Sequence, residues 1–517
     1  MNTDGIFMRG SYLIKTVAIC FFLIIMAMFS CNHSSTEPEP ELEPGGSYYT
    51  SPYTSPKFIF SGNKNAELNS KYEPLIVNGT YTFVFPEGTK LTGLVPEIYI
   101  PDNDKYKGSV IYIDDSIYEP DSAYDFSGNV QFIKIVAEDG KQIGNYRICV
   151  KTGVSYIDNK VYNFMNYFSI PEVSLSIMKG VEIVYSSGYG FADNETYTRC
   201  TSDHLFRVGN ISMQFCTMCI MTLKEEGRLR LDDKVFGSDG ILKGLYHDVT
   251  SYHDSITVRH LLSHSSGLSV PSFNSSYLYY ENTSIPVPTD TLIQRTLMNR
   301  QQPYDDGNMV WNAGAGYDFS NIGFCILQRI VEVISGKDYE SFLKEDVLSK
   351  MGIRDTHIGG DMSERRANEC RYYSQNDVDA YSYPLRELAG AIGIITSTNQ
   401  MMRILSFMDG DDTVPDIFSS ETLQEMYTPF LYSGAGSYGK GYNKCGLGWS
   451  INNDMFNGSH YSDGGKMDGT AALWVGCTNS EMSGAIICNT RAYNSNYQGD
   501  IDDNMYLLLN SFLSYFE

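Results

Sequence analysis

The stretch from Phe206 to Phe215 is the part of the chain whose residue types and spacing bear most directly on chemistry. Phe215, Met218 and Cys219 fall on one apolar stripe, which predicts a helix through this stretch. On a helix, Asn210 and Met213 are three residues apart and share a face. An asparagine amide is a poor nucleophile, and a methionine thioether cannot accept a proton at neutral pH. Ser212 offers a hydroxyl, but it lies about 200° around the helix from Asn210. We therefore expect it to point away from the face that Asn210 and Met213 share.

Two other patterns are often associated with catalysis or metal binding. His264 is followed by two serines, and Cys216 and Cys219 form a Cys-x-x-Cys spacing. The two cysteines fall within an apolar helical pattern and no second pair accompanies them, which favours small buried hydrophobic residues. We predict no metal site and no other cofactor.

Short motifs follow one another along the second part of the chain. They include Phe206–Phe215, Leu223–Lys234, Ile256–Leu268, Tyr317–Asn321, Met351–Thr356, Gly393–Thr398 and Gly446–Trp449. In type and order they resemble the β-lactamase-related serine hydrolases, a family of class C β-lactamases, D-alanyl-D-alanine peptidases and esterases. The resemblance covers residues 154–517. It implies an α+β fold with an antiparallel sheet flanked by helices and an additional helical subdomain.

The resemblance assigns roles to the first two motifs. In the family, a nucleophilic serine stands at the position of Asn210 and a lysine at that of Met213. A second motif places a tyrosine, which carries protons, two residues before an asparagine. With Asn321 as that asparagine, Phe319 takes the place of the tyrosine, and a phenyl ring has no proton to move. Tyr317 would take that place only if the register slipped by two residues, which would break the fit with the helix that follows.

The third motif of the family, His-x-Gly or Lys-Thr-Gly, lines the pocket from an edge strand. The resemblance places Asp463 at the histidine or lysine position, and a shift of one residue places Ser462 there. Neither register restores a base, and Lys466 is expected to lie past the turn. Gly464 and Gly465, together with Asn321, are the predicted ligand-binding residues. His264 belongs to a framework segment of the family, so we do not expect it to act in catalysis.

These exchanges remove the nucleophile and its proton carriers together. In a well-studied serine hydrolase such a loss lowers the rate by about 10⁶-fold. We interpret the chain as a pseudoenzyme that binds or scaffolds, with a cell-envelope peptide or peptidoglycan fragment as the ligand suggested by family analogy. The alternative is an active esterase, D-Ala-D-Ala peptidase or β-lactamase-like hydrolase with a rearranged site that uses Ser212 or Ser462.

Residues 58–153 have a different pattern, with apolar residues at every second position in short runs. The runs are Phe58–Phe60, Tyr81–Phe85, Glu97–Ile100, Ser109–Ile113, Val130–Val136 and Asn145–Val150. Gly, Pro and Asp separate them, which predicts strands joined by turns. We predict a small immunoglobulin-like β-sandwich that precedes the larger domain. It serves either as a spacer or as a binding module.

The N-terminus indicates export. Residues 1–30 contain an apolar run typical of a signal peptide and too weakly flanked to be preferred as a spanning helix. Cys31 follows Ser30 and precedes a Pro- and Glu-rich tether, residues 31–57, as in bacterial lipoproteins. We predict an outer-membrane or cell-surface lipoprotein held by a lipid on Cys31, or a periplasmic protein if Cys31 is not lipidated.

The charge balance bears on partners. The 517 residues carry a formal net charge of −24, and the sequence contains no stripe of basic residues. Nucleic acid binding requires such a stripe, so it is not expected. Nothing in the pattern specifies an oligomeric state.

Overall fold

The computed structural model describes most of the chain beyond residue 50. The described residues are 50–51, 55–68, 70–77, 79–128, 130–268, 275–281, 283–299, 304–305, 310–429, 445–452, 460–477, 482–493 and 500–517. Of a few of these, including Ser462 and Asp463, only the backbone is described. The predicted signal peptide, Cys31 and most of the predicted tether lie outside these residues. No helix among those described is long and apolar enough to cross a membrane.

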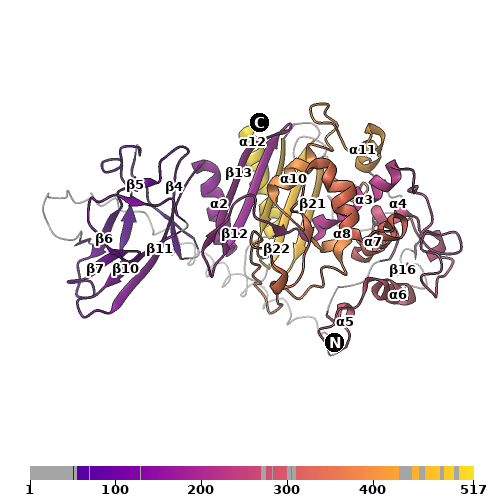
Figure 1. Cartoon of the computed structure of the whole chain (residues 1–517), viewed down its shortest axis with the longest axis horizontal. Coiled ribbons are helices and arrows are strands. Elements are labelled where there is room, and N and C mark those ends of the chain that lie inside the picture. The colour runs from indigo at the N-terminus through magenta and orange to yellow at the C-terminus, as the bar shows by residue number, and fades with distance from the viewer. Residues whose placement is uncertain are drawn as a thin grey trace, which may run out of the picture.

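The N-terminal domain is built from two main sheets (Figure 1). The larger one has the order β3-β4-β11-β10-β7-β8, and a smaller one has the order β1-β6-β2. Apolar side chains from both sheets, among them Phe58, Phe83 and Ile133, form one core. The strands are β1 Thr50–Ser51, β2 Lys57–Ile59, β3 Leu75–Val77, β4 Thr80–Pro86, β5 Thr92–Leu94, β6 Glu97–Pro101, β7 Val110–Ile113, β8 Ser116–Ile117, β9 Tyr124–Asp125, β10 Gln131–Val136 and β11 Gln142–Gly153.

All six strands predicted from the period-two runs are present, within one to three residues of their predicted bounds. The pairing of β4 with β11 is parallel, whereas β11 pairs with β10 in the antiparallel sense. A small β domain therefore precedes the larger domain, as predicted. Its immunoglobulin-like type stays a prediction.

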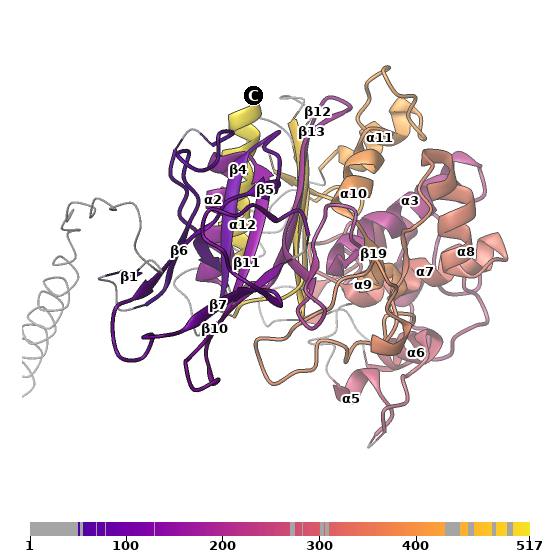
Figure 2. The ribbon, with the colours of Figure 1, turned by 60° about the vertical axis from the view of Figure 1, so that its left-hand side comes forward.

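The larger domain is centred on a seven-stranded antiparallel sheet with the order β14-β13-β12-β23-β22-β21-β20. Helices α2 and α12 cover one face, and α10 with the buried helix α3 lies on the other (Figure 2). The elements are α2 Ser155–Tyr167, β12 Glu172–Lys179, β13 Glu182–Asp193, β14 Thr198–Arg199, α3 Ser212–Glu225, α10 Thr398–Leu405, β20 Ser450–Asn452, β21 His460–Met467, β22 Thr470–Cys477, β23 Met482–Cys488 and α12 Ile501–Phe516. This arrangement confirms the predicted α+β class.

A helical region packs against α3 on the side away from the sheet (Figure 1). Its helices are α4 Val258–Leu262, α5 Ser275–Leu278, α6 Thr289–Asn299, α7 Asn321–Ser335, α8 Tyr339–Phe342, α9 Ala389–Ile392 and α11 Ser420–Tyr427. The short strands β15 Phe206–Arg207, β19 Ile394–Thr396 and β18 His357–Ile358 form a small sheet, and β16 Tyr304–Asp305 pairs with β17 Val310–Trp311. Helix α7 ends at Gly336 in the left-handed conformation, as the sequence predicts.

Helix α3 is more deeply buried than its sequence pattern indicates. The pattern favoured one apolar stripe, but every residue from Ser212 to Leu223 is buried. Neighbouring helices α7 and α9 and the sheet surround it, so polar side chains in α3 must also find partners inside the protein.

The two domains meet without a connecting loop. Strand β11 ends at Gly153, and α2 begins two residues later at Ser155. Lys151 of β11 pairs with the fully buried Asp158 of α2 at 2.9 Å. The face of β11 that carries Lys151 therefore packs against the large domain.

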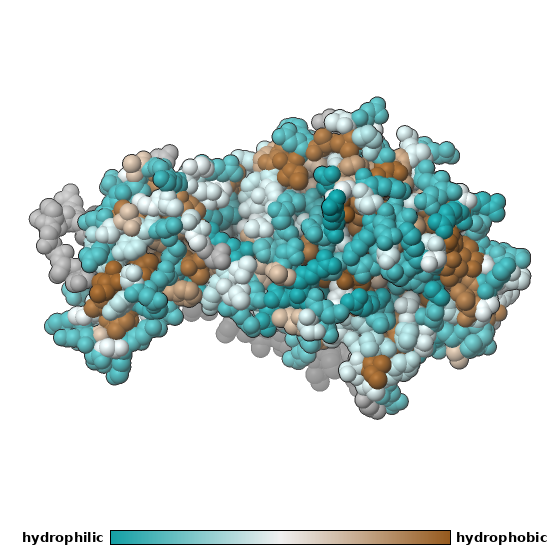
Figure 3. Space-filling view, in the orientation of Figure 1, coloured by the Kyte–Doolittle hydropathy of each residue, from teal (hydrophilic) through white to brown (hydrophobic). Residues whose placement is uncertain are grey.

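The face of the molecule shown in Figure 3 presents mostly hydrophilic residues, in keeping with the formal net charge of −24.

Candidate functional site

The start of α3 is held tightly against strand β21. A single 3₁₀ turn, Gly209–Ile211, precedes the helix, and Gly209 has a positive φ of 53°. A Cβ atom on Gly465 would lie 1.9 Å from the carbonyl oxygen of Val208, and one on Gly209 would lie 2.9 Å from the backbone nitrogen of Lys466. Glycine is needed at both positions because the two backbones approach so closely.

Asn210 and Asn321 are brought together at this point. The Nδ2 atom of Asn210 donates a hydrogen bond to Oδ1 of Asn321 at 2.7 Å. Asn321 is the first residue of α7, and the Ser320 hydroxyl caps that helix by accepting from the Gly323 N–H at 3.0 Å. The residues predicted from separate motifs therefore form one contact. It is a contact between two neutral amides, and neither is a base or an effective nucleophile.

Ser212 and Met213 lie inside the protein. The side chain of Met213 is fully buried in the apolar core around α3. Ser212 is also fully buried; its Oγ donates to the Gly209 carbonyl at 2.7 Å and accepts from the Ile394 N–H at 2.9 Å. Both hydrogen bonds tie the helix start to its surroundings. The geometry gives Ser212 a structural role.

Replacement of Ser212 by alanine is expected to lower the free energy of unfolding by about 1–3 kcal/mol, because the buried Ile394 N–H loses its hydrogen-bond acceptor. Urea denaturation measures this change. Ser511→Ala is a matched control, since Ser511 makes one hydrogen bond within α12, to Leu508 at 2.7 Å, and is only partly buried. Equal stability of the two variants would contradict the structural role of Ser212.

His264 supports the turn that precedes α7. Its Nδ1 accepts a hydrogen bond from the Ser320 N–H at 3.1 Å, and its ring stacks on Phe319 with 4.7 Å between the ring centroids. Burial lowers the pKa of His264 to about 3, so the imidazole is neutral at pH 7. Because the ring is neutral and Nδ1 accepts a hydrogen bond, Nδ1 carries no proton to donate. The ring therefore positions Phe319 and Ser320.

A pocket of about 290 Å³ opens beside Asn210. It extends past Gly464 of β21 to the first turns of α12. Its lining residues are Asn210, Tyr317, Phe319, Ser450, Gly464, Lys466, Ala472, Leu473, Asp502, Asp503, Met505 and Tyr506. Phe319 leaves 41% of its surface exposed, so this pocket offers ring surface next to the two amides.

The position of Lys466 differs from the sequence prediction. Strand β21 continues to Met467 and the turn follows at Asp468 and Gly469, so Lys466 lies before the turn and lines the pocket. The prediction that it sits past the turn was wrong, because no pattern in this glycine-rich stretch marks where the strand ends. Its Nζ pairs with Asp502 at 2.6 Å.

Asp502 is the anionic centre of this end of the pocket. Arg491 binds its two carboxylate oxygens at 2.9 and 2.8 Å. Burial alone would raise the pKa of Asp502, but the hydrogen bonds and charges of Arg491 and Lys466 bring the pKa below its usual value. Asp502 was not predicted as a site residue, because no local sequence pattern places α12 beside β21. The two elements meet only through the packing of the helix on the sheet.

The remaining predicted residues lie on or beside β21. Asp463 pairs with Trp474 of β22 in the sheet register, and Ser462 pairs with Val475 and with Ser450 of β20. The side chains of Ser462 and Asp463 lie outside the described residues. Gly464 lines the pocket. Gly465 lies where the backbone of β21 comes closest to Val208.

No group of three His, Cys, Asp or Glu residues within the described parts of the chain could hold a metal ion. Cys216 and Cys219 are fully buried in α3. Burial raises the pKa of both thiols, which keeps them protonated and unreactive.

Solved structures with the same fold include penicillin-binding proteins and β-lactamases. A penicillin-binding protein homologue from Pyrococcus abyssi has a TM-score of 0.56 and 20% identity, covering 70% of this chain and 77% of its own. A class C β-lactamase has a TM-score of 0.54 and 18% identity, covering 70% of this chain and 96% of its own. The large domain therefore has the fold of the serine β-lactamases and penicillin-binding proteins.

Sequence comparison gives the family. Residues 157–506 match the model of the Beta-lactamase family. Penicillin-binding protein 4* of Bacillus subtilis (strain 168) is 24% identical over 315 residues, which are 57% of this chain and 63% of that protein. The chain thus spans less than two thirds of that relative. It belongs to the β-lactamase family, and the resemblance inferred from its motifs is confirmed.

Proposed function

We propose that this member of the β-lactamase family is non-catalytic and uses the pocket beside Asn210 to bind a cell-envelope peptide or peptidoglycan fragment. The observation that carries the proposal is the 2.7 Å hydrogen bond between Asn210 and Asn321. It joins two amides where the family places its nucleophile and its substrate-holding asparagine. With Met213 buried and Phe319 lacking a hydroxyl, a proton carrier is missing from each of these positions.

The pocket suits a peptide ligand. Tyr317, Phe319 and Tyr506 supply ring surface, and Lys466, with half of its side chain exposed, and the exposed Asp503 supply charges of opposite sign. A peptide with a free carboxylate and an amine would find a partner for each group beside an apolar wall.

The protein would be exported and anchored through a lipid on Cys31. Labelling of growing cells with a radioactive fatty acid tests this part: the wild type should carry the label and a Cys31→Ala variant should not. An unlabelled wild type would contradict the lipid anchor.

Covalent labelling tests the loss of catalysis. The purified protein is treated with a fluorescent penicillin and a fluorophosphonate, beside the variant Asn210→Ser/Met213→Lys/Phe319→Tyr. We expect no labelling of the wild type, because the usual route has lost about 10⁶-fold in rate. Stoichiometric labelling that Ser212→Ala or Ser462→Ala abolished would establish the alternative, an active hydrolase with a rearranged site.

Binding is tested by calorimetry with soluble peptidoglycan fragments. A side chain at Gly464 would enter the pocket with little strain, since its Cβ would lie 3.6 Å or more from the neighbouring atoms. Gly464→Val is therefore expected to weaken binding at least about tenfold by filling the pocket. Gly128→Val, at an exposed turn of the β domain, is the matched control. Equal binding by both variants would contradict the assignment of this pocket.

A further inference from the structure

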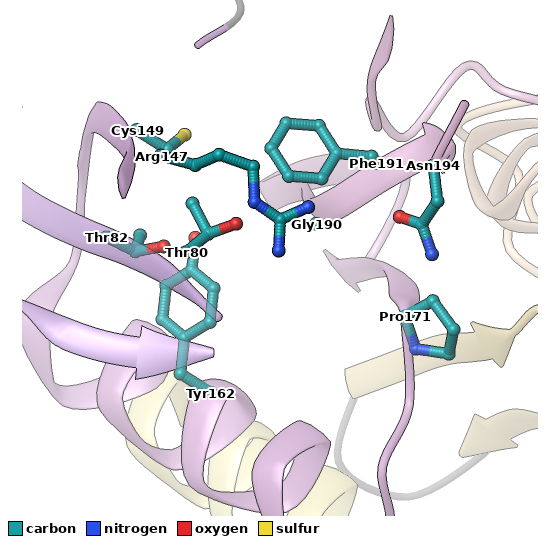
Figure 4. Close-up of a pocket in the computed structure, with 9 residues that line it drawn as sticks. All are labelled: Thr80, Thr82, Arg147, Cys149, Tyr162, Pro171, Gly190, Phe191 and Asn194. Carbon is teal, nitrogen blue, oxygen red and sulfur yellow. The ribbon is translucent and has the colours of Figure 1, made fainter. Parts of the chain in front are cut away.

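A second pocket lies where the β domain meets the large domain (Figure 4). It has a volume of about 240 Å³ and shares no residue with the pocket beside Asn210. Strands β4 and β11 form one wall. Helix α2, strand β13 and neighbouring segments of the large domain form the other wall. The residues that line it are Thr80, Thr82, Arg147, Cys149, Tyr162, Pro171, Gly190, Phe191 and Asn194.

This junction pocket is lined by one cationic side chain among the residues that the structure describes. Among its described lining residues, Arg147 alone is charged, and Figure 4 shows its guanidinium projecting between Thr80 and Phe191. A guanidinium that faces a cavity can donate paired hydrogen bonds to an anionic occupant.

Arg147 is held in place by its neighbours. Its guanidinium carbon lies 5.3 Å from the centroid of the Tyr197 ring, which in turn contacts Phe132 and Phe191 with 5.6 Å between centroids. A Cβ atom on Gly79 would come within 3.0 Å of Nη2, so this glycine makes room for the side chain. Stacking uses the face of the guanidinium, whereas its N–H groups point outward in the plane.

Neutral polar groups surround the cation. The Thr80 and Thr82 side chains are buried, and neither their hydroxyls nor the Asn194 side-chain amide bonds to any residue that the structure describes. Figure 4 shows Asn194 across the cavity from Thr80. The rings of Phe191 and Tyr162 are buried and form apolar wall. Two hydroxyls and one amide that open onto the cavity can exchange hydrogen bonds with a polar occupant.

We propose that the junction pocket binds a small organic carboxylate with a ring or short branched apolar part. The carboxylate accepts hydrogen bonds from the Arg147 guanidinium and from the hydroxyls and amide around it. The apolar part lies against Phe191 and Tyr162. Because the lining comes from both domains, the bound carboxylate contacts both and stabilises their contact.

Benzoate is a suitable probe, and benzamide is its neutral counterpart of the same shape. Calorimetry on the purified full chain is expected to show benzoate binding, with benzamide at least about tenfold weaker because the ionic hydrogen bonds are lost. Arg147→Gln should weaken benzoate binding by at least about tenfold as well. Arg386→Gln, which removes an exposed arginine of the large domain, is the matched control and should bind as the wild type does.

Arg147→Gln also removes a contact with Tyr197, so a second pair of variants guards against a change in the fold. Asn194→Asp places a negative charge across the cavity and should weaken benzoate binding at least about tenfold, while Asn194→Ala has a smaller effect. Equal affinity for benzoate and benzamide would overturn the proposal. So would wild-type affinity in both Arg147→Gln and Asn194→Asp, or no benzoate binding at roughly 10 mM.

Discussion

Glu172→Gln is expected to make the protein more stable at neutral and alkaline pH and to flatten the dependence of its stability on pH. Glu172 lies on β12, is fully buried, and neither of its carboxylate oxygens has a hydrogen-bond partner among the described residues. Burial raises its pKa from 4.5 to about 8, and the nearby Cys200 and Cys370 thiols and Arg365 offset this only in part. The native state therefore keeps this carboxyl protonated at pH 7.

The sign follows from the protons bound. Between about pH 4.5 and about 8 the unfolded chain has lost this proton and the native state has kept it. Stability falls as pH rises, by about 1.4 kcal/mol per pH unit from this group, reaching roughly 3 to 5 kcal/mol near pH 8. Glutamine keeps the shape and has no proton to lose, so this contribution disappears.

Urea denaturation of both proteins at several pH values measures the effect. The difference in unfolding free energy between Glu172→Gln and wild type should grow in favour of the variant from acid to alkaline pH. Glu182→Gln, an exposed glutamate on the neighbouring strand β13, should follow the wild-type profile. A constant difference between Glu172→Gln and wild type across this range would show that Glu172 is ionised in the native protein.

Lys151→Met is expected to destabilise the protein by about 3–5 kcal/mol, because it leaves the carboxylate of Asp158 buried without its cation. Asp158 is fully buried, and the Lys151 side chain has only 14% of its surface exposed. Lys151 also lies 4.0 Å from the centroid of the Tyr189 ring and donates to the Ser187 hydroxyl at 3.0 Å. The ion pair thus joins the two domains in a site that water does not screen.

The double variant Lys151→Met/Asp158→Asn should recover most of the lost stability, because it removes the buried charge along with its partner. Lys134→Met is the matched control. Lys134 pairs with Asp115 at the same distance, 2.9 Å, but that carboxylate is 95% exposed, so Lys134→Met should unfold at nearly the same urea concentration as the wild type. If Lys151→Met and Lys134→Met unfolded at the same urea concentration, the buried ion pair at the junction would contribute no more to stability than the exposed one.

Local patterns were sufficient to predict the elements and the framework. The period-two runs located the strands of the β domain, and Gly336 marked the end of α7. The motif order placed Asn210 and Asn321 in one site although 111 positions separate them. The strands and the helix end could be predicted because strand periods, caps and glycine turns act over a few residues. The pairing of Asn210 with Asn321 came from the resemblance to the family and not from local pattern.

The interactions that the sequence did not reveal all depend on packing between distant elements. Lys466 and Asp502 meet only because α12 crosses the sheet beside β21. Arg147 and Lys151 alternate with apolar residues as on a solvent-facing side of a strand, yet that side of β11 meets the large domain. Glu172 lies within a strand sequence that alternates in the ordinary way, and its lack of a partner is visible only when the neighbouring strands are in place.

The direct passage from β11 into α2 has a consequence for any attempt to separate the domains. A cut before Val154 would remove Lys151 and leave Asp158 without its cation in what remained of the large domain. A cut after α2 would take Ile157, Val161 and Met165 away from the core beneath the central sheet. Truncation at either place would damage one of the two pieces.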